Sequence, residues 1–235
     1  MPVSVHLLCL EANRRKALFW AFCDVWHGRA GDVQSYVSGI IVPLMKPSSD
    51  PVARALQEHV EIVAYDPVWP QRFEAEAAHL RALLPVELIG RIEHFGSTAV
   101  PGLSAKPIID MLVEVRTLED VAQHIAPVLR QHGYEFFWRD TEPGLPGIAY
   151  AWFIKRDAHA RRTHHIHCLE GRSSGWERLL FRDYLRAHPA AAREYDALKR
   201  RIAAEHPDDR KAYAKAKTGF IRRVMKAARR GAAHW

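Results

Sequence analysis

One stretch of the chain, residues 93–112, joins two apolar strands through a turn of small residues and places a single acid in the second strand. It reads EHFGSTAVPGLSAKPIIDML. The glycine and prolines between the two apolar runs predict a loop, so the unit is a strand, a turn and a strand. Because side chains alternate across a strand, Asp110 shares a face with Ile108 and Leu112. An ionised carboxylate in such apolar surroundings requires a metal, a cation or a cluster of donors nearby.

The turn before that acid has the chemistry of a phosphate site. Gly96 and Ser97 form a small-residue bend that exposes backbone N–H groups, and the serine hydroxyl adds a further polar contact. Lys106, on the loop that follows, adds positive charge. We therefore expect Gly96, Ser97 and Lys106 to bind phosphate beside Asp110.

These residues carry a resemblance to a known family. Residues 96–110 read GSTAVPGLSAKPIID, which looks like the opening of the nucleotidyltransferase superfamily and, more specifically, resembles the GrpB family, some of whose members are fused to dephospho-CoA kinase. The resemblance extends from about residue 62 to about residue 228. It implies a nucleotidyltransferase-like α/β (α+β) fold, with Asp110 and Ser97 at the catalytic positions and a divalent metal, Mg²⁺, Mn²⁺ or Zn²⁺, on Asp110. The superfamily's enzymes carry a second acid where this chain has Leu112, which puts transfer activity in question.

Composition restricts the class of protein and of partner. With 235 residues, 48% hydrophobic and 26% charged, the chain is typical of a soluble globule. The net charge of +7 and the pI near 9.5 favour anionic partners such as nucleotides, coenzyme A or RNA, although a solvated basic surface gives the same numbers. Three distant cysteines argue against a disulfide framework, so we expect a cytoplasmic protein. The apolar runs are too short for a membrane span, and no secretory signal is evident.

Residues 45–172 are expected to form the α/β core. Alternating apolar segments predict strands at 60–64, 88–95, 107–115, 134–139, 149–156 and 162–169, the first of them short. Helices are expected at 51–58, at 69–84 and at 117–133, the last with Thr117 as its cap and Asp120 completing a capping box. The expected architecture is a mixed or antiparallel sheet of about five strands with flanking helices, in which strands 88–95 and 107–115 are antiparallel neighbours.

Residues 1–44 differ from the rest, because their apolar weight shows no settled periodicity and the family resemblance does not reach them. Since residues 45–50 would make a natural polar start, we hypothesise that Met45 is the initiator and that residues 1–44 are an upstream extension. The alternative is an amphipathic arm that binds a protein partner.

A histidine-rich strand holds the second group of candidate functional residues. In THHIHC, residues 163–168, His165 and His167 share a face with Cβ atoms about 7 Å apart, close enough to chelate one metal, while His164 points away. Imidazoles that only bond their neighbours would give the same pattern. The superfamily commonly places a third acid on a later strand, so the resemblance implies that this strand lies beside Asp110. A mixed histidine and aspartate site favours Mn²⁺ or Zn²⁺ over an all-carboxylate Mg²⁺ site.

Residues 173–235 are expected to form helices packed on the core. Arg178, Arg182 and Arg186 recur every four residues and form a ridge, which suits either phosphate binding, with Arg182 and Arg186 as the favoured contacts, or a solvated face. A helix opened by Pro189 carries Tyr195 and Lys199, and a last helix from about residue 207 repeats that spacing.

Such tyrosine and lysine pairs resemble the triphosphate contacts of nucleotidyltransferases. We assign that role to Tyr213 and Lys217, although core tyrosines beside surface lysines would look the same.

Three functions fit these patterns. The first is a metal-dependent nucleotidyltransferase in which Asp110, His165 and His167 bind the ion, and Lys106, Arg182 and Lys217 offset phosphate charge. The second is a module that binds a nucleotide, coenzyme A or a protein partner and has lost transfer activity. The third is a zinc hydrolase, against which stands the absence of the helical His-Glu-x-x-His pattern.

Overall fold

The structure of the chain is a computed structural model that describes residues 59–139 and 149–232. Within these residues one five-stranded sheet forms the centre of the molecule. Its strands are β1 (Ile89–Phe95), β2 (Ile109–Val115), β3 (Glu135–Arg139), β4 (Tyr150–Arg156) and β5 (Arg162–Glu170). The expected sheet is confirmed. The hypotheses on residues 1–44 and the helix at 51–58 concern residues that lie outside the described part.

The sheet is mixed, with the strand order β1-β2-β5-β4-β3. Strands β2 and β5 run parallel at its centre, and the other neighbours run antiparallel, as expected for β1 and β2. The register places Asp110 opposite His165 and Leu112 opposite His167. Because neighbouring strands lie about 4.8 Å apart, this register alone brings the acid and the histidine strand together.

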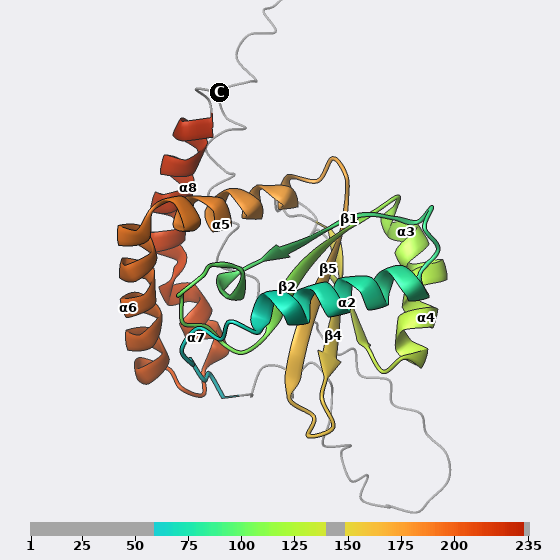
Figure 1. Cartoon of the computed structure of the whole chain (residues 1–235), viewed down its shortest axis with the longest axis horizontal. Coiled ribbons are helices and arrows are strands. Elements are labelled where there is room, and N and C mark those ends of the chain that lie inside the picture. Colours follow the sequence, from blue (N-terminus) through green and yellow to red (C-terminus); the bar gives the residue numbers. More distant parts are fainter. Residues whose placement is uncertain (1–58, 140–148, 233–235) are drawn as a thin grey trace, which may run out of the picture.

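Helices cover one face of the sheet. Helix α2 (Trp69–Leu83) begins with Pro70 in its first turn, and its buried side chains recur at helical spacing. Figure 1 shows α2 crossing the sheet, with α3 (Leu118–Asp120) and α4 (Ala126–Gln131) beyond it. The main core lies between these helices and the sheet, and on the sheet side it includes Ile109, Met111, Val113, Phe153 and Ile166. The alternation of β2 therefore leaves Asp110 on the other face.

The predicted helix at 117–133 exists but is not one regular helix. A π-helical turn, η3 (Val121–Ile125), separates α3 from α4. The predicted cap is confirmed, since the Thr117 Oγ1 accepts a hydrogen bond from the Asp120 backbone N–H at 3.0 Å. The strand predicted at 60–64 is wrong, because only Val63 pairs there, in an isolated bridge to Ala105, while the Val60 N–H bonds to the Pro207 carbonyl.

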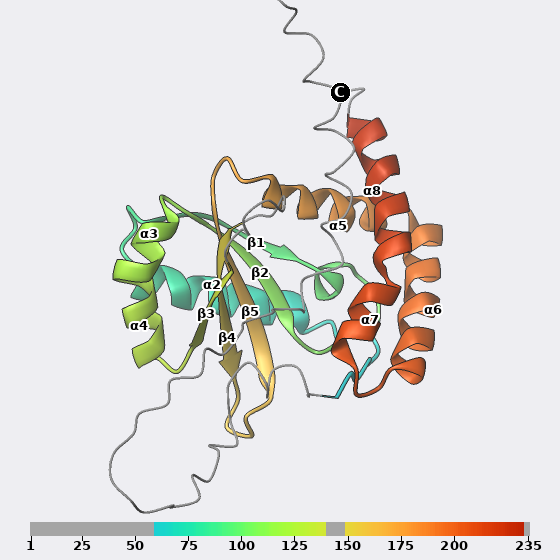
Figure 2. The ribbon, with the colours of Figure 1, turned by 180° about the vertical axis from the view of Figure 1, so that it is seen from behind.

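Four helices at the end of the chain pack beside the sheet, as expected. They are α5 (Arg178–Ala187), α6 (Pro189–Glu205), α7 (Arg210–Ala216) and α8 (Thr218–Ala232), with a 3₁₀ turn, η4 (Ser174–Glu177), before α5. Figures 1 and 2 show α6, α7 and α8 grouped at one end of the strands. The single helix predicted from about residue 207 is wrong, because the helix is interrupted at Lys217, between α7 and α8.

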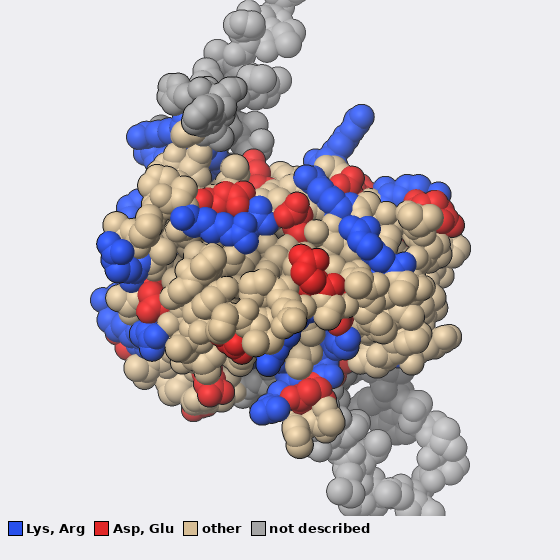
Figure 3. Space-filling model, in the orientation of Figure 1, with Lys and Arg blue, Asp and Glu red and all other residues tan. Residues whose placement is uncertain are grey.

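The surface shows no single basic field on the face seen in Figure 3, where Lys and Arg side chains lie interspersed with Asp and Glu. Charged side chains of the described residues also form ion pairs, such as that of Arg116 with Asp120 at 2.8 Å. In the part of the chain that the structure describes, no helix combines the length and the apolar character that crossing a bilayer requires.

Candidate functional site

The Gly-Ser turn forms as the sequence predicts. Gly96 follows β1 with φ +75° and ψ −170°, a conformation that is almost restricted to glycine. A Cβ atom at this position would lie 2.5 Å from Asp110 Oδ2. The 3₁₀ turn η2 (Ser97–Ala99) then brings Ser97 and Thr98 to the cavity described below, where Thr98 is buried and donates to the Ile108 carbonyl at 3.4 Å. The glycine therefore allows the turn to lie against the acid.

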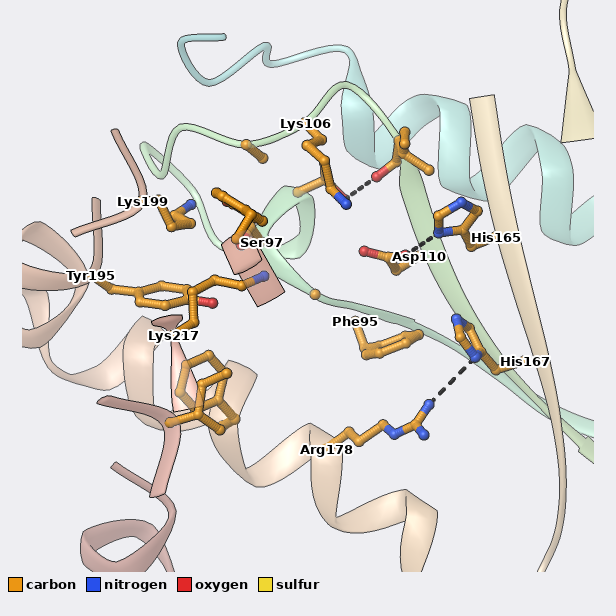
Figure 4. A pocket seen from close by; sticks show the side chains of 17 residues that line it. Phe95, Ser97, Lys106, Asp110, His165, His167, Arg178, Tyr195, Lys199 and Lys217 are labelled. Carbon is orange, nitrogen blue, oxygen red and sulfur yellow. Dashed lines mark hydrogen bonds and ion pairs between the residues drawn. The ribbon is translucent and has the colours of Figure 1, made fainter. Parts of the chain in front are cut away.

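Asp110, His165 and His167 meet on the face of the sheet that α2 does not cover. Each offers one ligand atom, and these three atoms all lie within 4.8 Å of one another. Figure 4 shows both imidazoles and the carboxylate facing the same space. His164 lies on the opposite face, where Glu76, Lys155 and Arg72 contribute to its electrostatic surroundings. The structure thus brings together the acid and the two alternate histidines that the sequence analysis singles out.

Each imidazole also contacts a buried arginine. The Arg162 Nη1 lies 3.3 Å from His165 Nε2, and the Arg178 Nη1 lies 3.4 Å from His167 Nδ1. Arginine has no acceptor, so it donates in both contacts. His165 then carries its proton on Nδ1 and donates it to Asp110 Oδ1, which lies 3.1 Å away.

Aromatic rings enclose the two imidazoles. His167 lies 5.3 Å from the rings of Phe95 and Tyr150, and Trp152 lies 5.2 Å from His165. This burial lowers the pKa of His165, and the neighbouring Asp110 opposes only part of the effect. A neutral imidazole is the form that binds a metal ion.

The position of the superfamily's second acid lies in the core. Leu112 is fully buried and packs with four other apolar side chains. They are Phe95, Tyr150, Leu169 and Trp176. Glu114, further along β2, pairs instead with Arg91 at 2.9 Å. Within the described residues, Asp110 is therefore the one acid of this metal-competent group.

Lysines from the C-terminal helices form the opposite wall. The Lys217 Nζ lies 4.4 Å from the centre of the Tyr213 ring, and the Lys199 Nζ lies 5.0 Å from that of Tyr195. Lys106 approaches the Tyr213 ring as well, at 5.8 Å. Figure 4 shows Lys106, Lys199 and Lys217 across the cavity from the histidines. The structure thus brings the predicted Lys106, Tyr213 and Lys217 to the same site as Asp110.

Lys199 is the least exposed of these lysines. Its side chain is 2% exposed and donates to the Ser104 carbonyl. Burial lowers the pKa of Lys199 to about 7, a shift that nearby Asp196 opposes and that Lys217 and Arg200 reinforce. Its charge therefore changes near neutral pH, which is unusual for a lysine.

The cavity between the two walls has a volume of about 160 Å³. Its cationic lining residues are Lys106, Arg178, Lys199 and Lys217, and among the described residues that line it Asp110 is the one carboxylate. Phe95, Gly96 and Ser97 also line it, and Gly96 lies against the Asp110 carboxylate. Cationic walls around a single acid suit an anionic ligand.

Two predicted phosphate contacts lie elsewhere. Arg182 donates to Glu93 Oε2 and to the His94 carbonyl, both at 2.8 Å, and Arg186 donates to the Ala99 carbonyl at 2.9 Å. Both line a separate hollow on the other side of β1 and not the cavity. The assignment of Arg182 and Arg186 to this site is therefore corrected. Of the three arginines on the α5 ridge, only Arg178 lines the cavity.

Two cationic residues that line the cavity are not among the predicted contacts. Arg178 belongs to the arginine ridge, but the sequence analysis favours Arg182 and Arg186 as the phosphate contacts. Lys199 is named there only for its spacing from Tyr195. The repeated spacing of tyrosine and lysine is a signal for Lys199, since Tyr195 and Tyr213 both line the cavity. No local signal separates Arg178 from Arg182, because four residues along a helix change a side chain's direction only slightly.

Comparison with known proteins agrees with this geometry. The family model described as GrpB protein matches residues 59–227, which include the sheet, the turn and helices α5 to α7. The chain belongs to the GrpB family. A crystal structure of the GrpB protein from Enterococcus faecalis is similar to it, with 37% identity and a TM-score of 0.61 over 73% of this chain and 98% of that one. The expected family and fold are thereby confirmed.

Relatives in the GrpB family differ in length. The UPF0157 protein YqkA of Bacillus subtilis is 41% identical over 73% of this chain but only 48% of its own, so the match spans about half of that relative. The glutamate-rich protein GrpB of Alkalihalophilus pseudofirmus is 34% identical over 71% of this chain and 94% of its own. A dephospho-CoA kinase of Mycobacterium tuberculosis is 29% identical over 75% of this chain and 44% of its own.

Proposed function

We propose that this GrpB protein binds a nucleotide or another phosphorylated small molecule together with one divalent metal ion. The observation that carries the proposal is the approach of Asp110, His165 and His167, whose ligand atoms lie within 4.8 Å of one another beside a cavity lined by lysines. A metal needs several ligands at such separations, and a phosphate needs cations and hydrogen-bond donors.

The donor set fits a metal ion of intermediate softness. One carboxylate and two imidazoles suit Mn²⁺ or Zn²⁺ better than Mg²⁺, which prefers oxygen ligands. A bound ion would supply charge neutralisation at the phosphate. Asp110 and the two histidines would hold it, with Gly96 allowing the turn to stay close to the carboxylate.

The other wall supplies the phosphate contacts. Lys106, Lys199 and Lys217 surround the cavity, and Ser97 lies at its edge on the small-residue turn. The cavity of about 160 Å³ is smaller than the roughly 300 Å³ of typical ligand pockets, so it fits phosphate groups, with the remainder of the ligand outside. The similarity to part of proteins named dephospho-CoA kinase supports a nucleotide-containing ligand.

Transfer of a nucleotidyl group is the finer proposal, with Asp110 and Ser97 at the reacting centre. The burial of Leu112 favours the alternative, a module that binds the nucleotide or coenzyme A and acts on a protein partner without catalysis. Two-metal phosphoryl transfer needs carboxylates between the ions, and the metal-competent group among the described residues holds one.

Thermal shift tests the binding proposal. Nucleoside triphosphate with Mn²⁺ or Zn²⁺ should raise the Tm, because a ligand bound only by the folded form stabilises it. Asp110→Asn and His165→Ala should remove this shift. His164→Ala is the matched control, since His164 lies on the same strand but on the opposite face. An unchanged shift in the first two variants would show that the ligand binds elsewhere.

Transfer activity is tested separately. If the protein transfers a nucleotidyl group, pyrophosphate should appear from a nucleoside triphosphate in the presence of Mn²⁺ and a candidate acceptor, and Asp110→Asn should abolish it. Binding without pyrophosphate release across acceptor classes would favour the non-catalytic module.

A further inference from the structure

The two histidines of the candidate metal site are not poised to bind an ion. In the hydrogen-bonding pattern that the arginines impose, His165 has its proton on Nδ1, toward Asp110, and its Nε2 lone pair accepts from Arg162. His167 has its Nδ1 lone pair directed to Arg178, which leaves the proton on Nε2. Each imidazole has one lone pair, and a guanidinium occupies it in both cases.

The arginine opposes metal binding by His167 whichever ring nitrogen is taken as the ligand. Coordination through His167 Nδ1 competes directly with Arg178, and coordination through Nε2 moves the proton to Nδ1, where it would face an arginine N–H. The guanidiniums also oppose a cation by charge, since the side chains of Arg162 and Arg178 are both buried. Asp110 is then the one ligand that the group offers directly.

Arg178 is the arginine that a ligand can reach. It lines the cavity, and Arg162 does not. Its contact with His167, at 3.4 Å, is longer than most hydrogen bonds, whereas a guanidinium and a phosphate form short, charge-assisted bonds. A phosphate in the cavity can therefore exchange with His167 as the partner of Arg178.

We propose that the divalent ion binds this site only in company with a phosphate-bearing ligand. The ligand draws Arg178 away from His167, which frees that imidazole, and its oxygens take coordination positions that the protein leaves open. Arg162 meanwhile keeps His165 as a donor that orients Asp110, so the inference narrows the protein ligands of the proposed function to Asp110 and His167. This inference rests on the proposed function and adds an order of binding to it, because the anion must bind before the metal site is complete.

Calorimetric titration of the full chain tests the coupling. The three titrants are Mn²⁺ alone, inorganic pyrophosphate alone, and Mn²⁺ at a saturating pyrophosphate concentration, with the heat of Mn²⁺ binding to free pyrophosphate subtracted. We expect the affinity of the protein for Mn²⁺ to be at least about tenfold higher with pyrophosphate present. By linkage, Mn²⁺ should raise the affinity for pyrophosphate by the same factor.

The role of Arg178 is tested by Arg178→Met, which keeps the length of the side chain and removes its charge and donors. This variant should bind Mn²⁺ alone about tenfold more tightly than the wild type, and the effect of pyrophosphate on Mn²⁺ affinity should shrink. Arg186→Met is the matched control, because Arg186 lies on the same helix but outside the cavity, and it should leave Mn²⁺ affinity unchanged. Circular dichroism monitors folding of both variants.

The outcomes separate this inference from the proposed function. Equal Mn²⁺ affinity with and without pyrophosphate in the wild type would overturn the inference and leave a metal and phosphate site in place. If a folded Arg178→Met variant binds Mn²⁺ alone no more tightly than the wild type, the proposed role of Arg178 is wrong. If neither Mn²⁺ nor pyrophosphate binds, alone or together, the proposed function fails with it. Should Arg178→Met not fold, the wild-type titrations still decide on the coupling.

Discussion

Gly96 and Asp110 lie so close together that a methyl group on the glycine would come within 2.5 Å of the carboxylate Oδ2. The two residues sit on different elements, the turn after β1 and the strand β2, and their contact joins the candidate phosphate turn to the candidate metal ligand. A side chain at position 96 would therefore displace the carboxylate.

Gly96→Ala should lower both stability and ligand binding. Alanine at φ +75° and ψ −170° costs about 1–3 kcal/mol, and its Cβ would displace the Asp110 carboxylate. Gly102→Ala is the control, because Gly102 also has a positive φ, +77°, but a Cβ there meets nothing within 4 Å. Urea unfolding and the thermal shift with nucleotide and Mn²⁺ measure the two effects. Normal ligand binding by Gly96→Ala would show that Asp110 is not a ligand contact.

Leu112→Asp, which places an acid where nucleotidyltransferases carry their second one, should destabilise the protein rather than activate it. Leu112 is fully buried among apolar side chains, so an unpaired charge there is costly. Leu112→Ala should cost about 2–5 kcal/mol through the cavity it leaves, and Leu112→Asp should cost more. Urea unfolding compares the two. A stable Leu112→Asp variant that releases pyrophosphate would show instead that this position can face the site.

Anion affinity should fall as the pH rises from 6 to 8. The pKa of Lys199, lowered to about 7, means that its ammonium is present at pH 6 and mostly lost at pH 8. Since the charged form attracts phosphate, loss of one required proton weakens pyrophosphate binding by about tenfold over this range. Lys199→Met should bind pyrophosphate more weakly than the wild type at pH 6, and its affinity should depend less on pH.

The comparison between variants removes the titration of pyrophosphate itself. Lys215→Met, a change of an exposed lysine on α7, should keep the wild-type profile. Parallel profiles for the wild type and Lys199→Met, measured by calorimetry, would show that Lys199 does not contact the anion.

Substitution of Arg182 should lower stability without affecting ligand binding, and substitution of Lys217 should do the opposite. Arg182→Met removes bonds to Glu93 and to the His94 carbonyl, so the free energy of unfolding should fall by about 1–3 kcal/mol while pyrophosphate affinity stays within about twofold. Lys217→Met should do the reverse, with affinity about tenfold lower and little change in stability, because Lys217 lines the cavity. Chemical unfolding and calorimetry of both variants measure this. Weakened binding in Arg182→Met would restore it as a phosphate contact.

Much of the sheet and part of the site follow from local sequence. The alternation of apolar residues predicts the faces of β2 and β5, so the common orientation of Asp110, His165 and His167 follows from the order of residues in the two strands. Thr117 likewise marks the start of a helix as predicted. These signals act over a few residues, where steric limits and hydrogen bonding depend little on the rest of the chain.

The arrangement of the helices is less accessible from the sequence. The break at Lys217, which separates α7 from α8, carries no proline, and the helical pattern runs through it. The choice among the three arginines of α5 is also wrong, because only the packing of that helix against β1 decides which of them reaches the cavity.

The sequence by itself determined the strand, turn and strand around Asp110, the alternate histidines and the family, because each depends on neighbours in the chain. Only the tertiary structure decided that β2 and β5 lie side by side, that Lys199 is buried against the cavity, and that Arg162 and Arg178 bond to the imidazoles. These contacts join residues far apart in the chain, and their partners are set by the packing of whole elements, which no short pattern encodes.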